Sequence, residues 1–420
     1  MVDVVLINSP MQEYSDDHKP EYFTTAPIGL GYIATIANKE GIETLIVDAE
    51  AERLSPRETM QRVNGYSPHS VGINSFSTNH EIVTKILNGV EAPNRYVGGP
   101  HAALSPQRLD GNYTVIKGEA ELLFPSLVMD SPLKRQTENR VVESGFVRDL
   151  DGLPFVDREL FTGDPYETSN GLEASISSSR GCTFKCVYCS VPTINGTKMR
   201  SRSIDNVLDE IEGLQEEGVK RIHFVDDLFN YSPERVRDFC EGIEERGLDF
   251  GWRALCRTDK LDGELLETMA DSGCYKLAFG VESATPRILK YIGKSQKLDQ
   301  TKSVFDKCAE LGIESKGFFT IGYPTETEED IRRTIDFALD LNPDDARFMV
   351  VRAFPGTRLY DDMIRGGMDL ESLDNYHQFA TGGEYVKYHV MNIHALNGMP
   401  PEELDVYIKE AYIKFNEIRK

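Results

Sequence analysis

The feature that most constrains the fold of this chain is a repeated alternation of short apolar runs with stretches of helical periodicity. Five apolar runs in the first part are expected to form buried strands, at residues 4–7, 44–47, 71–73, 95–97 and 113–116. Helical patterns lie between them, as at 29–38 and 81–87. Strands joined by crossover helices pair in parallel. We therefore predict a doubly wound parallel sheet, which binds ligands beyond the carboxyl ends of its strands.

A second alternation follows. The runs expected to form strands are 174–178, 222–225, 253–255, 277–279, 318–321 and 348–351. Helical patterns separate them, and Val207, Ile211 and Leu214 share one helical face. Six strand–helix units predict a partial barrel, a shortened relative of the eight-stranded form. Its active site is expected at the carboxyl ends of the strands.

The two alternations predict an α/β chain of two domains, and a length of 420 residues favours the same division. We expect a Rossmann-like domain over residues 1–144 and a partial (β/α)6 barrel of the TIM type over 169–365. Residues 145–168 carry charges, Gly and Pro without helical period and are interpreted as an ordered linker.

The remaining residues, 366–420, are expected to form a small, mostly helical tail that closes the substrate pocket. Its last part has an amphipathic stripe typical of a helix, made of Leu404, Ile408, Ala411, Tyr412 and Phe415. The polar residues expected over the pocket are Tyr376, His377, Gln378 and 385–389.

Composition excludes several classes of function. A net charge of −23 repels phosphate backbones and anionic lipid, so neither nucleic acid nor a membrane is an expected partner. No apolar run approaches the roughly 20 residues of a membrane-spanning helix, and we see no signal peptide. Seven cysteines without regular pairing argue against a disulfide framework and favour a cytoplasmic location.

Three of those cysteines lie within eight residues, at Cys182, Cys186 and Cys189, directly after the first strand of the second alternation. Cluster iron prefers thiolate ligands, and three ligands on a four-iron cube leave one iron open to bind another molecule. Zinc is the main alternative because of the Cys-x-x-Cys pair. A closed zinc site usually shows a second pair, and none is near in the sequence.

This segment resembles the radical SAM superfamily, whose signature is Cys-x3-Cys-x2-Cys with an aromatic residue before the last cysteine. Tyr188 fills that position. The resemblance covers roughly residues 172–360. It implies a 4Fe-4S cluster on the three cysteines, which act as metal ligands and catalytic residues. The cluster cleaves S-adenosylmethionine (SAM) reductively to a 5′-deoxyadenosyl radical.

The resemblance also implies contacts with SAM, from Tyr188 and from residues at the ends of the later strands. These residues are Asp226, Asp227, Arg257, Glu282, Ser283, Ile321, Gly322 and Arg352. The two aspartates would hold the amino end of SAM, and the alternative is a helix cap or a solvated turn. The residues at 282–283 would lie near its methionyl and ribose parts, and those at 321–322 would pack against adenine. Either arginine would pair with the SAM carboxylate or with a surface acid.

Upstream, the chain resembles the cobalamin-binding domain that often precedes such barrels. The matching segments are 8–10, 27–32, 71–75, 98–101 and 117–121. The implied contacts are Ser75, Ser77, Thr78, Gly98, Gly99, His101, Gly118 and Glu119. Glycines let the backbone approach a flat macrocycle. The Asp-x-His-x-x-Gly motif of mutase-type domains is missing, because Asp16-Asp17-His18 lacks the glycine. Cobalt would thus be bound without that histidine.

The resemblance favours cobalamin-dependent methylation of an unactivated carbon of a small biosynthetic metabolite. One SAM would methylate the corrin, and a second would generate the substrate radical. The enzyme alternative is a radical reaction without methyl transfer, such as dehydration, epimerisation, ring contraction or cyclisation, with the cobalamin slot empty or repurposed. A cluster-bearing electron carrier without catalysis is a third class. The expected partners are a small-molecule substrate and an external one-electron donor such as flavodoxin or ferredoxin.

Overall fold

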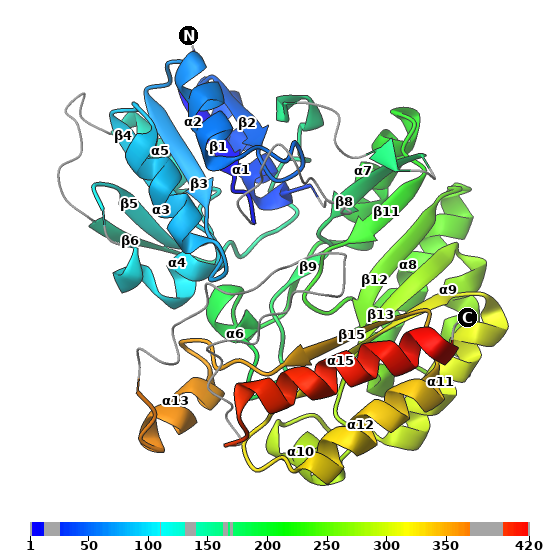
Figure 1. Ribbon diagram of the computed structural model, residues 1–420. Coiled ribbons are helices and arrows are strands. Elements are labelled where there is room, and N and C mark those ends of the chain that lie inside the picture. The colour runs from blue at the N-terminus through cyan, green and yellow to red at the C-terminus, as the bar shows by residue number, and fades with distance from the viewer. Residues whose placement is uncertain are drawn as a thin grey trace. The chain divides into compact units, whose positions relative to one another are not determined.

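The computed structural model describes residues 2–11, 26–109, 111–130, 140–162, 167–168, 171–369 and 398–418 (Figure 1). These residues fall into two compact units. The first unit contains the described residues up to Glu167 together with Thr193–Asn195, and the second contains the others. The domain boundaries expected from the sequence stay predictions. The Asp16–His18 segment and the polar tail residues at 376–378 and 385–389 lie outside the described residues.

The first unit alternates strands and helices along its whole length. Its strands are β1 (Val4–Asn8), β2 (Thr44–Asp48), β3 (Ser70–Asn74), β4 (Asn94–Gly98), β5 (Thr114–Gly118) and β6 (Arg140–Gly145). Its α-helices are α1 (Ile28–Lys39), α2 (Pro56–Gly65), α3 (His80–Gly89), α4 (Pro100–Leu104) and α5 (Phe124–Met129). Short 3-10 turns cover Pro106–Arg108 and Arg158–Leu160.

The six strands form one parallel sheet in the order β2-β1-β3-β4-β5-β6. The chain winds to one side of β1 and then to the other, so the switch point lies between β1 and β3. The doubly wound sheet and its first five strands are confirmed. The sequence did not reveal β6, because most of its side chains are exposed and it has no buried apolar run.

Alternate residues of β1 enter two separate cores, since successive side chains of a strand point to opposite faces. Val5 and Ile7 pack with apolar residues of α2 and α3. Val4 and Leu6 pack with α1 and with a set from the segment predicted to be a linker, namely Val147, Leu150, Leu153, Val156 and Phe161. That segment is therefore not a free spacer, because its apolar side chains complete the core of the first unit.

The second unit holds a larger sheet. Its main strands are β8 (Gly171–Ile176), β11 (Arg221–Phe224), β12 (Gly251–Cys256), β13 (Cys274–Glu282), β14 (Glu314–Ile321) and β15 (Asp345–Val350). Short strands are β7 (Glu167–Thr168), β9 (Ser179–Arg180) and β10 (Arg200–Ser201). The helices are α7 (Ile204–Glu216), α8 (Pro233–Arg246), α9 (Gly263–Asp271), α10 (Pro286–Tyr291), α11 (Leu298–Leu311), α12 (Glu328–Leu341), α13 (Arg358–Arg365) and α15 (Pro401–Ile418). The short helix α6 (Val191–Ile194) is divided between the two units. A 3-10 turn covers Thr258–Lys260.

The six main strands are parallel and run in the order β15-β14-β13-β12-β11-β8, with β7 next to β8 at the edge. Trp252, Ala254 and Cys256 of β12 point into the core under the helices, where Val207, Ile211 and Leu214 are also buried. The face of the sheet away from that core is polar at the start of the strands. Arg253 on this face pairs with Glu173 at 2.7 Å. The predicted half-barrel is confirmed.

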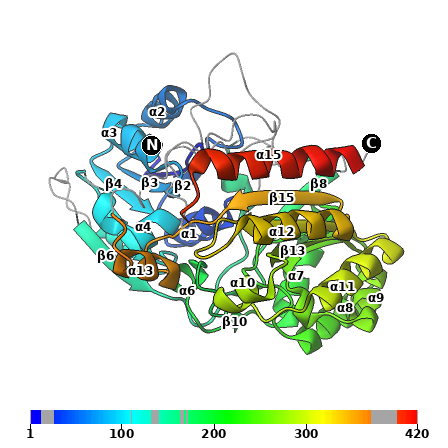
Figure 2. The same cartoon turned by 60° about the horizontal axis from the view of Figure 1, so that its bottom comes forward.

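The last helix, α15, lies along α12 and β15 (Figure 2). All five residues of its predicted stripe are buried. Its Tyr412 hydroxyl accepts a hydrogen bond of 3.1 Å from the backbone nitrogen of Phe348, on the outermost strand β15. The helix therefore covers the strand and satisfies one of its edge groups.

Candidate functional site

The three clustered cysteines lie on a loop that leaves the carboxyl end of β8. Cys182, Cys186 and Cys189 are free thiols, and each side chain is partly exposed. Backbone hydrogen bonds hold the loop, from Val187 to Ile292 at 3.0 Å and from Cys182 to Gly196 at 3.3 Å. The loop is thus a fixed scaffold that presents three thiols at the functional end of the half-barrel.

The thiols are close enough to influence one another. Burial, together with the charges of Cys186 and Cys182, raises the pKa of the Cys189 thiol to about 12. The pKa of Cys182 is also raised, first by burial. No three Cys, His, Asp or Glu side chains among the described residues are grouped closely enough to hold a single metal ion. Three crowded thiolates need compensating positive charge, which is what cluster iron provides to its cysteine ligands. The donor set therefore fits a cluster.

Two aspartates after β11 hold the start of the cysteine loop. The buried carboxylate of Asp226 accepts hydrogen bonds from the Ser178 backbone nitrogen at 2.7 Å and from the hydroxyls of Ser178 and Ser179, both at 2.6 Å. Asp227 accepts one from the backbone nitrogen of Gly181 at 2.8 Å. Both carboxylates thus bind the segment before Cys182. Their role toward SAM stays a prediction.

Glu282, at the end of β13, is the centre of a buried polar cluster. Its Oε1 accepts from the Lys294 ammonium at 2.8 Å and its Oε2 from the Thr320 hydroxyl at 2.8 Å. Tyr188 of the cysteine loop also hydrogen-bonds to Glu282. The cluster therefore joins the loop to β13 and β14. Lys294 carried no motif in the sequence, and only the structure brings it here.

The other predicted SAM residues lie at the expected strand ends. Ser283 is buried, with its hydroxyl 3.3 Å from that of Thr334 on α12. Gly322 follows β14 with a φ of 88°, and its backbone nitrogen donates to the buried carboxylate of Glu326. Burial raises the pKa of Glu326 from 4.5 to about 7. Ile321 is buried at the end of β14, and Arg352 follows β15.

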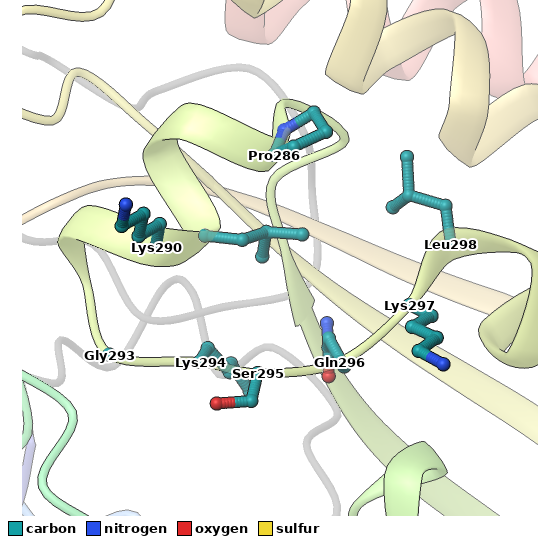
Figure 3. Close-up of a pocket in the computed structure, with 9 residues that line it drawn as sticks. Pro286, Lys290, Gly293, Lys294, Ser295, Gln296, Lys297 and Leu298 are labelled. Carbon is teal, nitrogen blue, oxygen red and sulfur yellow. The ribbon is translucent and has the colours of Figure 1, made fainter.

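A cavity of about 350 Å³ lies between α10 and the start of α11 (Figure 3). Its lining includes Lys290, Ser295, Gln296 and Lys297. The side chains of Lys290 and Lys297 point away from each other, so their ammonium groups do not converge on one ligand atom. Gly293 in this wall packs closely against the cysteine loop. A Cβ atom at this position would lie only 3.1 Å from the Lys185 carbonyl oxygen. The cavity wall therefore supports the loop.

In the first unit, the carboxyl ends of β2, β1 and β3 share a chain of polar contacts. The side-chain amide of Asn8 donates to the Asp48 carboxylate at 2.7 Å, and the side-chain amide of Asn74 donates to the side-chain Oδ1 of Asn8 at 2.7 Å. Asn79 donates to the Ser9 hydroxyl at 2.7 Å. This network fixes the backbone at the switch point, where such sheets bind ligands. The sequence signal for it was an asparagine at the end of each of two strands.

The predicted cobalamin contacts lie at the ends of β3, β4 and β5 and in the segments that follow them. His101 is fully buried, with its Nδ1 3.1 Å from the Ser77 hydroxyl, and its ring stacks on His80 at 4.6 Å. Gly99 has a φ of 90°, and a Cβ there would lie 2.9 Å from the Ser75 nitrogen. The Ser75 hydroxyl is buried without a partner among the described residues. A polar ligand would supply that partner, so the site fits a corrin side chain or nucleotide tail.

Four further residues were predicted to contact cobalamin. Gly98 is the last residue of β4 and Thr78 precedes α3. Gly118 ends β5 with a φ of 107°, and Glu119 accepts a hydrogen bond from the Val147 nitrogen at 2.6 Å. Glu119 therefore anchors the segment after β6, and its contact with cobalamin stays a prediction.

Comparison with known proteins decides the family. A model of the radical SAM superfamily matches residues 176–338, and a model of the B12 binding domain matches residues 22–128. An uncharacterised methyltransferase of Pyrococcus horikoshii is 30% identical over 416 residues, which cover 93% of this chain and 88% of that protein. The chain belongs to the radical SAM superfamily. Its N-terminal part is a B12 binding domain, so its cofactors are a 4Fe-4S cluster, SAM and cobalamin.

Other relatives of this radical SAM enzyme have named substrates. The cytidylyl-2-hydroxyethylphosphonate methyltransferase of Streptomyces wedmorensis is 27% identical, over 82% of this chain and 78% of that protein. Among solved structures, the radical SAM methyltransferase TsrM of Kitasatospora setae, with cobalamin and a [4Fe-4S] cluster bound, matches with a TM-score of 0.67. It is 20% identical, over 87% of this chain and 75% of that one. This likeness confirms the fold. Within the described residues, no helix combines the length and apolarity needed to cross a bilayer.

Proposed function

We propose that this enzyme transfers a methyl group from SAM, by way of cobalamin, to an unactivated carbon of a small biosynthetic metabolite. The observation that carries the proposal is the cysteine loop. Three partly exposed thiols lie at the carboxyl end of a half-barrel, on a loop held by buried hydrogen bonds, in a chain that also has a B12 binding domain. When bound, the cluster supplies one electron to the sulfonium of SAM and cobalamin carries a methyl group.

The residues of the chain position these groups. Asp226 and Asp227 fix the start of the cysteine loop, and the Glu282 cluster fixes Tyr188 near its end. The buried Lys294–Glu282 pair keeps the carboxylate oriented at the end of β13. These contacts set the thiols before any ligand arrives. A preorganised site of this kind loses less entropy when the reactants bind.

Relatives favour methyl transfer over other radical chemistry. The bacteriochlorophyllide d C-12(1)-methyltransferase of Chlorobaculum tepidum is 27% identical, over 84% of this chain and 77% of that protein. This enzyme and the phosphonate methyltransferase act on very different small molecules. The common element is therefore the methyl donor system, and the substrate of this chain is proposed only as a small metabolite.

The test uses anaerobically reconstituted protein with cobalamin and SAM that carries a trideuterated methyl group. We expect S-adenosylhomocysteine only when both cobalamin and a reductant are present, and the deuterated methyl group on the corrin or on a product. Mass spectrometry measures both. Formation of 5′-deoxyadenosine without any cobalamin-dependent S-adenosylhomocysteine would contradict methyl transfer.

That contradicting result would instead support a radical reaction without methylation. One observation favours this second candidate. The anaerobic magnesium-protoporphyrin IX monomethyl ester cyclase of Rubrivivax gelatinosus is 25% identical, over 80% of this chain and 66% of that protein. The same two-domain sequence pattern is thus compatible with an enzyme whose name indicates ring closure.

We also propose an external one-electron donor such as flavodoxin or ferredoxin. The four cysteines outside the triad are Cys240, Cys256, Cys274 and Cys308, and all are buried as free thiols. They provide no second exposed triad for a relay cluster, which supports a separate protein as the source of the electron. We expect reduced flavodoxin with its reductase to replace dithionite in forming 5′-deoxyadenosine. Turnover with dithionite but with neither flavodoxin nor ferredoxin would contradict this partner.

A further inference from the structure

Arg257 has an unusual set of partners beside the cysteine loop. It is the first residue after β12, and its side chain is buried. Its Nε and Nη2 donate to the two carboxylate oxygens of Asp259, each at 2.8 Å. Its Nη1 donates toward the sulfur of Cys186, 3.9 Å away. The guanidinium lies over the ring of Phe184, 3.8 Å from the ring centre.

The backbone of Arg257 is held as firmly as its side chain. The side-chain Oδ1 of Asn230 accepts a 2.9 Å hydrogen bond from the Arg257 backbone nitrogen, and the side-chain Nδ2 of Asn230 donates to the Arg257 backbone carbonyl oxygen at 2.9 Å. Asn230 is itself fully buried. Both ends of the residue are therefore fixed, and Nη1 is directed at the sulfur by the fold rather than by chance rotation.

This geometry does not suit the role expected from the sequence. A guanidinium clamps a carboxylate best with two parallel N–H groups. Asp259 already takes one such pair from Arg257. The remaining terminal nitrogen faces a cysteine of the triad and the ring of Phe184. A bidentate grip on the SAM carboxylate is therefore not available to Arg257 in this arrangement.

We infer that Arg257 is a positioning residue for the iron–sulfur cluster and raises its reduction potential through Cys186. The inference rests on the cluster assigned to the three cysteines. Hydrogen bonds to cluster sulfurs and nearby charge set the potential of such centres. Reduction adds negative charge, which a fixed cation and an N–H donor stabilise. Asp259 and Phe184 hold the guanidinium so that its charge stays beside Cys186.

The experiment compares Arg257→Lys and Arg257→Gln with the matched control Arg253→Lys. Arg253 belongs to the same strand, β12, but its guanidinium pairs with Glu173 of β8. Each reconstituted protein is titrated with reductant while the cluster is followed by electron paramagnetic resonance. Iron and sulfide content and the dissociation constant for SAM are measured on the same samples.

We expect the midpoint potential to become more negative in Arg257→Gln, and by a smaller amount in Arg257→Lys, which keeps the charge but loses the planar fork. The Arg253→Lys control should match the wild type. An unchanged midpoint potential in Arg257→Lys, measured on protein with full iron content, would overturn the inference. If Arg257→Gln fails to hold iron, the result for Arg257→Lys alone decides the question. An unchanged potential with SAM binding weakened tenfold or more would instead assign Arg257 to SAM.

The outcome is separable from the proposed methyl transfer. The potential is measured without substrate and without turnover, so a shift in Arg257→Lys stands even if no S-adenosylhomocysteine forms. Conversely, the wild type could transfer methyl groups normally while the Arg257 variants keep the wild-type potential. That result would contradict the inference about Arg257 and leave the proposed methyl transfer intact.

Discussion

At the scale of single residues, the carboxylate of Asp226 holds the start of the cysteine loop through hydrogen bonds. Three hydrogen bonds reach it from Ser178 and Ser179, and burial raises its pKa. Removing it leaves a buried backbone N–H and two hydroxyls without their acceptor. The loop that carries Cys182 follows directly, so stability and cluster binding depend on the same side chain.

We therefore expect Asp226→Ala to lower the free energy of unfolding by about 2–4 kcal/mol, because several buried donors lose their partner. It should also lower the iron content after reconstitution. The exposed Asp238→Ala on α8 is the control and should change stability by less than about 0.5 kcal/mol. Urea unfolding and iron analysis check both. If the two variants had the same stability and the same iron content, Asp226 would not hold the cysteine loop as described.

The pH dependence of stability is predicted from Glu326. Its pKa rises from 4.5 to about 7 on folding, because burial disfavours the carboxylate. The folded protein then holds a proton that the unfolded chain has lost, so stability falls as pH rises from 4.5 to about 7 and is level above that. The change is about 3 kcal/mol at most. Glu326→Gln should remove this slope in unfolding curves measured across that range. A slope that persists in the variant would show another group to be responsible.

The role of Cys182, Cys186 and Cys189 as cluster ligands could be predicted from the sequence, because the spacing of these ligands is local. The partners of those residues could not. Lys294 meets Glu282 only because α10 and the following loop return the chain to the end of β13. Likewise, the sequence placed Arg257 at a strand end but could not show that Asp259 accepts hydrogen bonds from two nitrogens of its guanidinium.

At the scale of elements, α15 protects the outermost strand of the half-barrel. The Tyr412 hydroxyl bonds the Phe348 nitrogen at 3.1 Å, and the ring contacts Phe348 edge-on at 5.3 Å. We expect Tyr412→Phe to lower stability by about 1–2 kcal/mol, since the ring remains while the buried hydrogen bonds of the hydroxyl with the Phe348 nitrogen and carbonyl oxygen are lost. Tyr231→Phe is the control, because the Tyr231 hydroxyl makes an exposed hydrogen bond to the Ser201 hydroxyl at 3.0 Å and its loss should change stability little. Thermal unfolding compares them, and an equal loss in both would contradict the edge role.

Element prediction succeeded where apolar periodicity was strong and failed where the signal was not apolar. The six main barrel strands and the α15 stripe followed from buried side chains. Strand β6 has mostly exposed side chains and was missed. The segment 145–161 looked like a linker because its apolar residues have no helical period, yet five of them pack in the first core. Tertiary contact, rather than local pattern, orders that segment.

At the scale of the whole molecule, the chain consists of two units that the family match assigns to different cofactors. We expect Gly99→Ala to reduce bound cobalamin, because a Cβ would collide with the Ser75 backbone at a φ of 90°. The iron content of the second unit should stay at the wild-type level. Gly65→Ala, at the end of α2, where a Cβ meets nothing within 4 Å, is the control. Absorbance of the bound corrin measures the effect, and loss of iron together with corrin would contradict separate sites.

The most direct test of the account is the formation of 5′-deoxyadenosine by anaerobic, iron-loaded protein supplied with SAM and a reductant. The account predicts that the wild type and the control Cys240→Ala, which alters a buried thiol outside the triad, both form it. Single alanine variants of Cys182, Cys186 and Cys189 should form none. Cleavage that persists in any triad variant, or none in the reduced wild type, would contradict it.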